Sequence, residues 1–332
     1  MSIPNDYGDS RAEYRAAYER AAWFDLSDRG KIKLAGKEAV FFLNNLCTND
    51  VKNLAVGAGC EAFLCTAKAK VVAHMFVSHY SSDVLLLDFE PGQTEKVFDH
   101  LNHYLISEQV EITDRSSEFR LAHLCGPHAH GILEKLLDKP LGDLPPLQLR
   151  LESYILIRRN DPLGLPGFDL FFPPEKWIDV LEPITLAGGA EPAGLDAWEM
   201  LRVEAGTPVY GKDIDENRLV MEVGRTQQAI CYTKGCFLGQ EPIVMARDRG
   251  HVNRTLLGIR FDGETPAAPG TRLFRDGAEV GQVTSSVVSY RLGPIALAYL
   301  KRGHQEPGTI VELDPTADGR KALVSALPFS LP

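Results

Sequence analysis

Residues 234–241 read Lys-Gly-Cys-Phe-Leu-Gly-Gln-Glu and lie just ahead of the point where the chain changes character. The two glycines beside Cys236 permit a tight turn that lifts its thiol off the surface, and Lys234 would favour the thiolate. Gln240 and Glu241 add polar groups to a glycine loop, a setting that commonly binds a ligand. The alternative is a glycine-punctuated loop around a buried and inert cysteine.

After about residue 250 the chain consists of short apolar runs, with Asp-Gly pairs at 262–263, 276–277 and 318–319. Asp-Gly between such runs is typical of hairpin turns. The expected strands are 256–261, 271–274, 279–288, 295–300, 309–313 and 322–327. Six short strands without a long helix predict a small closed β-barrel as a separate C-terminal domain, residues 251–332.

Upstream of this barrel, residues 1–250 mix helices and strands without a strict strand-helix-strand rhythm, which predicts an α+β domain. A capping box of Ser10 and Glu13 opens the first expected helix, which ends near Trp23. Further helices are expected at 39–46, 91–105, 129–136, 174–186 and 195–205. Strands are expected at 30–34, 61–64, 71–79, 84–89, 119–124, 154–158 and 168–172. The Pro- and Gly-rich segment 140–146 predicts a break between two subdomains near 140–150.

The composition excludes several classes of protein. With 332 residues, 44% hydrophobic and 24% charged, the chain is expected to form two or three globular domains. Its 35 basic and 45 acidic residues give a net charge of −10, which repels phosphate backbones and anionic lipid. We therefore expect neither nucleic-acid nor membrane partners.

The chain termini and cysteines indicate a cytoplasmic protein. The first nine residues resemble no targeting signal, and no apolar run approaches the roughly 18 residues that suggest a membrane span. The six cysteines form no CxxC pair, which fits free thiols in a reducing compartment. His123, Cys125, His128 and His130 are close in sequence, but Gly-Pro turns the chain between them, so no permanently bound metal is expected.

Segment 234–241 resembles the signature of the YgfZ-like folate-binding proteins. These form a branch of the superfamily that includes the T-protein (aminomethyltransferase) of the glycine cleavage system. The resemblance covers about residues 13–329. Further landmarks of the superfamily occur in the right order at 24–32, 48–51, 126–129, 201–213 and 281–286.

This resemblance implies a folate-binding domain of two interlocked α+β halves, followed by a six-stranded Greek-key barrel. It implies tetrahydrofolate or a derivative in the central opening, with the pterin held by Glu204. A carboxylate suits that role, because it accepts two parallel N–H bonds from a 2-amino-4-oxo pterin. Cys236 would act as a redox-active or transient ligand thiol assisted by Lys234. The other expected folate-binding residues are Thr48, Asp50, Arg225, Gln240 and Glu241.

One landmark of the T-protein is absent from its expected place. Val97 falls about where the catalytic aspartate of the T-protein is expected, although a slip of one or two residues would bring Glu95 or Asp99 there. Without a carboxylate beside N5 of folate, aminomethyl transfer lacks its acid/base or electrostatic partner.

Three hypotheses on function follow. The first is a tetrahydrofolate-binding accessory protein, rather than an enzyme, that assembles or repairs iron-sulfur clusters. Its partners would be iron-sulfur enzymes or cluster-assembly proteins. The second is a folate-dependent aminomethyltransferase or demethylase acting on a small amine, with Asp88, Glu90, Glu95 or Asp99 as the carboxylate. The third is a binding module in which folate is vestigial.

Overall fold

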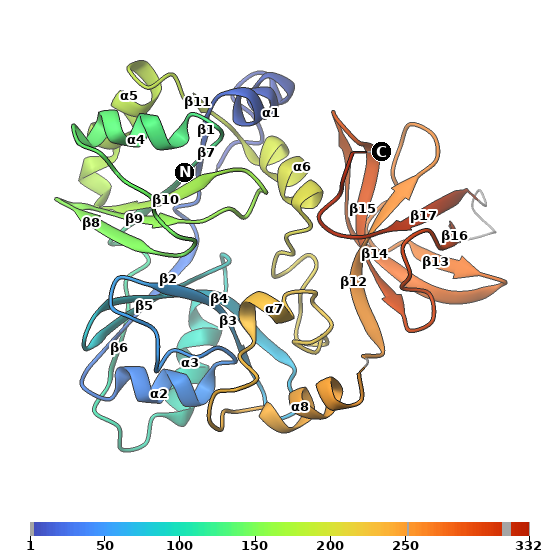
Figure 1. Ribbon diagram of the computed structural model, residues 1–332, viewed down its shortest axis with the longest axis horizontal. Coiled ribbons are helices and arrows are strands. Elements are labelled where there is room, and N and C mark those ends of the chain that lie inside the picture. Colours follow the sequence, from blue (N-terminus) through green and yellow to red (C-terminus); the bar gives the residue numbers. More distant parts are fainter. Residues whose placement is uncertain (1–2, 251, 314–319, 332) are drawn as a thin grey trace. The chain divides into compact units, whose positions relative to one another are not determined.

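The computed structural model describes residues 3–250, 252–313 and 320–331 (Figure 1). Two compact units interleave along the chain. The first unit comprises Met1–Asp161, Leu165–Ala197 and Gln227–Gln240. The second unit comprises Pro162–Gly164, Trp198–Thr226 and Glu241–Pro332. Each unit has hydrophobic cores of its own.

One half of the first unit is a five-stranded sheet in the order β3-β4-β5-β2-β6. Its strands are β2 (Gly30–Ala35), β3 (Gly59–Cys65), β4 (Val71–Ser81), β5 (Val84–Phe89) and β6 (Glu111–Asp114). Helices α2 (Ala39–Leu46) and α3 (Thr94–Tyr104) cover one face of this sheet. Apolar residues of α2 at i, i+3, i+4 and i+7 pack on alternate residues of the strands to form one core.

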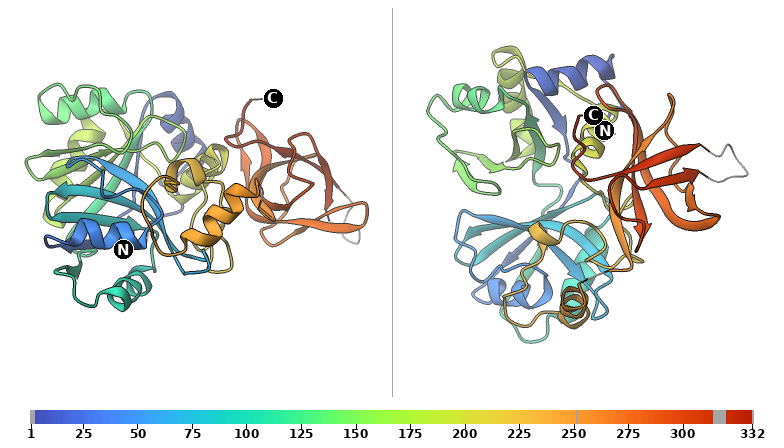
Figure 2. Two further views of the ribbon diagram at one scale, coloured as in Figure 1. Left: turned by 60° about the horizontal axis from the view of Figure 1, so that its bottom comes forward. Right: turned by 45° about the vertical axis from the view of Figure 1, so that its right-hand side comes forward.

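The other half of the first unit is a six-stranded sheet in the order β11-β1-β7-β10-β9-β8. Its strands are β1 (Ala22–Asp25), β7 (Arg120–Cys125), β8 (Leu149–Glu152), β9 (Ile155–Arg159), β10 (Gly167–Phe172) and β11 (Glu191–Pro192). Helices α4 (Ala129–Leu137) and α5 (Trp177–Leu186) form a second core with it, and η1 (Pro174–Lys176) leads into α5. The two sheets therefore lie between two pairs of helices, in four layers (Figure 2).

The remaining helices are α1 (Ser10–Glu19), α6 (Leu195–Ala205), α7 (Thr226–Ala229) and α8 (Gln240–Asp248). Gly126, between β7 and α4, shows why the superfamily turn at 126–129 needs glycine. Its φ is +113°, and a Cβ there would lie 2.6 Å from the carbonyl oxygen of Ala17. The turn is therefore structural. None of the helices among the described residues is long and apolar enough to cross a membrane.

The second unit contains a closed barrel in the order β12-β15-β14-β13-β16-β17. Its strands are β12 (Arg254–Phe261), β13 (Arg272–Arg275), β14 (Ala278–Ser289), β15 (Gly293–Lys301), β16 (Ile310–Leu313) and β17 (Lys321–Ser325). Strands β13, β14 and β15 follow one another as hairpins, and β16 returns beside β13, which is the Greek-key order. The predicted α+β fold with a six-stranded Greek-key barrel is confirmed. The predicted turn at 318–319 lies outside the described residues.

Several predicted details are wrong for local reasons. The N-cap of α1 is Asp9 rather than Ser10, because the Asp9 carboxylate accepts from the backbone N–H groups of Arg11 and Ala12. Glu13 reaches instead to the backbone N–H groups of Tyr7 and Gly194. Helix α1 also ends at Glu19, so Trp23 belongs to β1.

Candidate functional site

The segment Thr48–Asp50 joins β3 to the 227–240 stretch within the first unit. Thr48 is fully buried, and its Oγ1 donates to the carbonyl of Ala229 (2.6 Å) while it accepts from the N–H of Phe63 (2.9 Å). The Asn49 amide donates to the carbonyls of Glu61 and Gln228, both at 2.8 Å. Thr48 is therefore a positioning residue that brings the two segments together.

Asp50 follows in the same turn and keeps part of its carboxylate exposed. It accepts hydrogen bonds from the backbone (3.1 Å) and the side chain (2.7 Å) of Asn53. Slight burial would raise the pKa of Asp50, but the hydrogen bonds from Asn53 outweigh it and the pKa is lowered. Asp50 is thus an ionised carboxylate beside the 227–240 stretch.

Lys234 has a different role from the one predicted. Its ammonium is buried and donates to three carbonyls, those of Asn44 (2.6 Å), Cys47 (2.9 Å) and Asn49 (2.6 Å). Burial lowers the pKa of Lys234 below its ordinary value. Because three hydrogens meet three carbonyls, Lys234 anchors the turn at residues 44–49 rather than serving the Cys236 thiol.

The Cys236 loop presents its thiol to solvent, which excludes the alternative of a buried cysteine. Cys236 is exposed, whereas Cys65 beneath the loop is buried and its thiol lies 3.2 Å from the carbonyl of Leu238. Gly239 has a φ of +82°, and a Cβ there would lie 2.7 Å from the Cys65 sulfur. The motif therefore requires glycine for close packing. Gln240 and Glu241 follow as the first residues of α8, with Glu241 exposed.

Glu204 lies at the end of α6 in the second unit, where it is 6% exposed. The hydroxyl of Ser289 donates to its Oε1, and the Arg291 guanidinium lies 3.8 Å from its Oε2. Ser289 is itself fixed by the backbone N–H groups of Arg291 (3.1 Å) and Leu292 (2.9 Å). The barrel thus sets the orientation of a buried carboxylate, which a sequence pattern cannot reveal.

Two of the superfamily landmarks meet around Arg202 in the second unit. The fully buried guanidinium donates to Asp213 (2.8 Å) and to the Ser285 hydroxyl (2.8 Å). Thr284 donates to the other oxygen of Asp213. The landmarks 201–213 and 281–286 therefore form one buried hydrogen-bonded network, and Arg202 at its centre lies two residues before Glu204 on α6. Arg202 and Asp213 are positioning residues that sequence reasoning missed.

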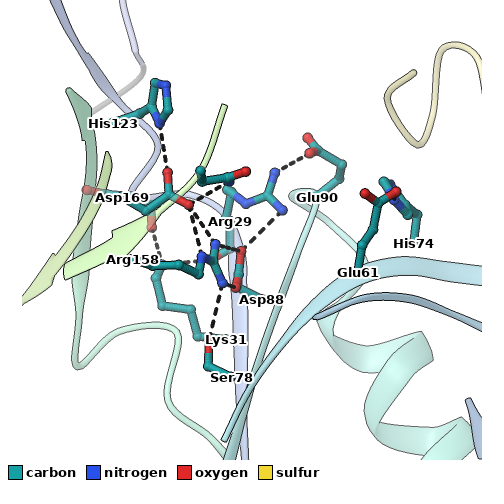
Figure 3. Close-up of polar contacts among 12 residues, drawn as sticks. Arg29, Lys31, Glu61, His74, Ser78, Asp88, Glu90, His123, Arg158 and Asp169 are labelled. Carbon is teal, nitrogen blue, oxygen red and sulfur yellow. Dashed lines mark hydrogen bonds and ion pairs between the residues drawn. The ribbon is translucent and has the colours of Figure 1, made fainter. Parts of the chain in front are cut away.

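A buried ionic cluster, which was also not predicted, lies between the two sheets of the first unit (Figure 3). Arg158 donates to Asp88 on β5 and to Asp169 on β10, with Asp169 Oδ2 at 2.7 Å. Burial would raise the pKa of Asp169, but Arg158 and the hydrogen bond from His123 hold it well below its usual range. Arg29 adds ion pairs to Asp88 (3.3 Å) and Glu90.

Beside this cluster, β3 and β4 carry a buried acid-imidazole pair. His74 Nε2 lies 2.7 Å from Glu61 Oε1, and both side chains are under a tenth exposed. The imidazole ring lies between Phe63 (4.9 Å between centroids) and Phe76 (6.0 Å). Since the Asn49 amide binds the carbonyl of Glu61, this pair is continuous with the Thr48–Asp50 turn.

The four candidate carboxylates divide into two pairs. Asp88 and Glu90 are neutralised by arginines within the ionic cluster, whereas Glu95 and Asp99 are exposed on α3. Val97 on α3 is fully buried in the core, so its side chain is not available to a ligand. Within the described ranges, no group of three or more His, Cys, Asp and Glu side chains is placed to hold a metal ion. His123, one of the sequence candidates, is bonded to Asp169 at 2.8 Å.

Two family models match consecutive parts of the chain. The model of the GCVT N-terminal domain matches residues 1–227, and that of the glycine cleavage T-protein C-terminal barrel domain matches residues 254–330. The two together cover most of the chain, which therefore belongs to the glycine cleavage T-protein family. Membership in this family implies tetrahydrofolate as a ligand.

Individual relatives agree over nearly the whole length. The aminomethyltransferase of Geobacillus thermodenitrificans is 31% identical over 98% of this chain and 92% of its own. That of Caldanaerobacter subterraneus subsp. tengcongensis is 29% identical over 94% of this chain and 85% of its own. The crystal structure of the glycine cleavage system aminomethyltransferase T from Bartonella henselae has the same fold, with a TM-score of 0.91, 23% identity and coverage of 99% and 91%. These relatives do not distinguish the YgfZ-like branch, which stays a hypothesis.

Proposed function

We propose that this protein is a tetrahydrofolate-dependent one-carbon transferase of the aminomethyltransferase type, acting on a small amine or an aminomethylated carrier. The observation that carries the proposal is the similarity of both parts of the chain to proteins named aminomethyltransferase, over 98% of its length in one case. Glu204 supports the proposal as a buried carboxylate that Ser289 holds in one orientation.

Glu204 fits the pterin ring of the folate. Its carboxylate is a hydrogen-bond acceptor fixed by Ser289, and a 2-amino-4-oxo pterin offers parallel N–H donors to such a group. The folate supplies N5, the nitrogen that takes up the one-carbon unit. Further contacts are proposed from predicted residues that are at least partly exposed, namely Asp50, Arg225, Gln240 and Glu241.

The proton partner of the transfer is proposed on α3. Asp88 and Glu90 are poorly suited, because their carboxylate oxygens already bind the guanidinium groups of Arg29 and Arg158. Glu95 and Asp99 are exposed on α3, so a substrate could reach their carboxylates. Glu95, in the first turn of α3, is the first residue to test, with Asp99 as the second.

A second candidate function has its own supporting observation. Cys236 is an exposed free thiol on a loop held in place by Lys234 and Gly239, and Val97 stands near the expected place of the aspartate. Both features favour a folate-binding accessory factor that delivers or repairs iron-sulfur clusters, with the thiol as a transient ligand. Its clients would be iron-sulfur enzymes or cluster-assembly proteins of the cytoplasm.

The deciding experiment combines binding and turnover. Tetrahydrofolate is titrated by calorimetry into the wild type, Glu204→Gln, Cys236→Ala and, as a matched control, Glu19→Gln on exposed α1. Loss of a charge-assisted bond predicts about 10- to 100-fold weaker binding in Glu204→Gln alone. Turnover is followed as ammonia released from an aminomethylated donor, dependent on added tetrahydrofolate.

The outcomes separate the two functions. Folate-dependent ammonia release that is lost in Glu95→Gln or Asp99→Asn, but kept in Cys236→Ala, supports the transferase. Folate binding without turnover, together with reduced iron-sulfur enzyme activity in cells that carry Cys236→Ala, supports the accessory factor. Absence of folate binding in the wild type contradicts both and leaves the vestigial binding module.

A further inference from the structure

A cavity of 430 Å³ lies between the two sheets of the first unit. On one side it is lined by residues of β2, β4 and β5. Lys33 on β2 and Ser78 on β4 both lie opposite Leu86 on β5, so the three side chains form one row across the sheet. On the other side, Leu151 pairs with Leu156, and Leu156 with Phe171. The cavity is therefore a gap between two facing rows of side chains, with a volume typical of a small-molecule site.

The walls and the mouth of this cavity are mainly apolar. Leu86, Leu156 and Phe171 pack together in a small core at its wall. Tyr80, Leu151 and Tyr154 also line it and are 40%, 53% and 37% exposed. Large apolar side chains that are exposed together around a hollow are a common sign of a binding site.

The charged groups of the cavity leave an excess of positive charge. Among the described residues Lys33 has no ion-pair or hydrogen-bond partner for its ammonium. The Nε of Arg115 is buried without a partner, although its other end is paired with Glu118. Asp88 is the acidic group at the cavity, and it is already neutralised by Arg29 and Arg158.

Strand pairing places Lys33 and Arg115 on the same face, whereas the ammonium of Lys31, the third basic group at the cavity, is bound by the carbonyls of Ser27 and Arg29. Lys33 lies opposite Thr113 in the β2–β6 pair, and the backbone N–H of Arg115, two residues further on, donates to the carbonyl of Lys31. Side chains two residues apart on a strand point to one face. Lys33 and Arg115 thus both face the gap between the sheets, next to its apolar walls.

We propose that this cavity binds a small amphipathic monocarboxylate, with its apolar chain between Leu86, Leu156 and Phe171 and its carboxylate at Lys33 and Arg115. The apolar walls select the alkyl chain of the ligand, and the Lys33 ammonium with the unpartnered Nε of Arg115 selects a single anionic head. An alcohol of the same length fills the walls but offers no negative charge to these two donors. The cavity is lined by residues of the first unit, and none of the residues proposed to contact folate is among them.

The test uses decanoate as the probe, titrated calorimetrically into the full-length protein below its micellar concentration. We expect saturable binding to the wild type, weakened about 10-fold in Lys33→Gln and in Arg115→Gln through loss of a charge-assisted bond. The matched control is Lys68→Gln, in the exposed turn between β3 and β4, which should bind as the wild type does. Decanol should bind weakly and equally to all four proteins.

Two further measurements test whether decanoate binds in this cavity. Leu86→Trp fills the gap and should abolish decanoate binding; its thermal unfolding is recorded to show that it folds, and if it does not, the two charge variants decide. Decanoate should leave the affinity for tetrahydrofolate unchanged. The proposal is overturned by absence of saturable binding, by equal decanoate affinity in wild type, Lys33→Gln and Arg115→Gln, or by competition between decanoate and tetrahydrofolate.

Discussion

The guanidinium of Arg158 on β9 and the carboxylate of Asp88 on β5 form a two-point ion pair that joins the two sheets of the first unit. The same guanidinium binds Asp169 on β10. Phe76 and Phe171 lie 4.8 Å and 5.1 Å from its centre. Arg158 is only 1% exposed, so its charge is satisfied entirely within the protein. The Arg158 guanidinium thus holds the two sheets together, and its removal should lower the stability of the first unit.

Replacing Arg158 by methionine should strongly destabilise the protein. The variant keeps much of the side-chain volume but leaves Asp88 and Asp169 as buried carboxylates without this partner. Breaking a buried pair in this way costs about 3–5 kcal/mol. Urea unfolding measures the change, with Arg15→Met as the control, because the Arg15–Glu19 pair is 72% and 53% exposed and such pairs contribute at most about 1 kcal/mol. Equal losses in the two variants would show that Arg158 does not join the sheets.

Acid should weaken the protein through Asp169. Its folded-state pKa lies well below the unfolded value of about 3.9, because Arg158 and His123 outweigh the effect of burial. The unfolded state therefore binds the proton more readily, so the stabilisation is complete above about pH 4 and is lost as the pH falls through the folded pKa. Urea midpoints measured from pH 6 to pH 2.5 should fall less steeply in Asp169→Asn than in the wild type. Parallel curves would assign the acid sensitivity to other carboxylates.

Strands that show clear alternation could be predicted from the sequence, and weakly patterned strands could not. The bounds of β5 and α2 are as predicted, and all six barrel strands are found within a few residues. Strand β1 was missed because it has only four residues directly after a helix and pairs with distant β7 and β11. Strand β6 reads Glu-Ile-Thr-Asp at a sheet edge, where polar residues hide the pattern.

The site was predicted less completely, for a related reason. Sequence spacing placed Lys234 near Cys236. The direction of its long side chain, however, is set by the carbonyls that accept its hydrogen bonds, and these belong to residues 44–49. Asp88, Arg158 and Asp169 come from three strands, and their pairing exists only after the sheets pack. The sequence offered one signal of this cluster, namely a charged residue inside each of three otherwise apolar strands. The boundary near residue 250 stays a prediction, since the two compact units interleave along the chain.

Replacing Lys234 should destabilise the turn that it anchors. Lys234→Met leaves three carbonyl acceptors without their donor in a buried setting, at a cost of about 1–3 kcal/mol. Urea unfolding compares it with Lys68→Met, whose side chain is exposed and should contribute almost nothing. A stability equal to that of Lys68→Met would mean that water replaces the lysine at no cost.

The six thiols should react in two groups. Cys47, Cys60, Cys65 and Cys125 are buried, and burial raises the pKa of each, to about 12 for Cys65. Thiolate is the reactive form, so these four should react with a disulfide reagent only after unfolding. Exposed Cys236 should give the fastest phase in the native protein, followed by half-buried Cys231.

Variants assign the fast phase and test the anchoring role of Lys234. Cys236→Ala should abolish that phase and leave stability within about 0.5 kcal/mol of the wild type, as expected for an exposed side chain. Lys234→Met should keep the fast rate, because the ammonium is bonded to carbonyls rather than to this thiol. A large fall in the Cys236 rate in Lys234→Met, with the fold intact by circular dichroism, would restore the lysine as the activator of the thiol.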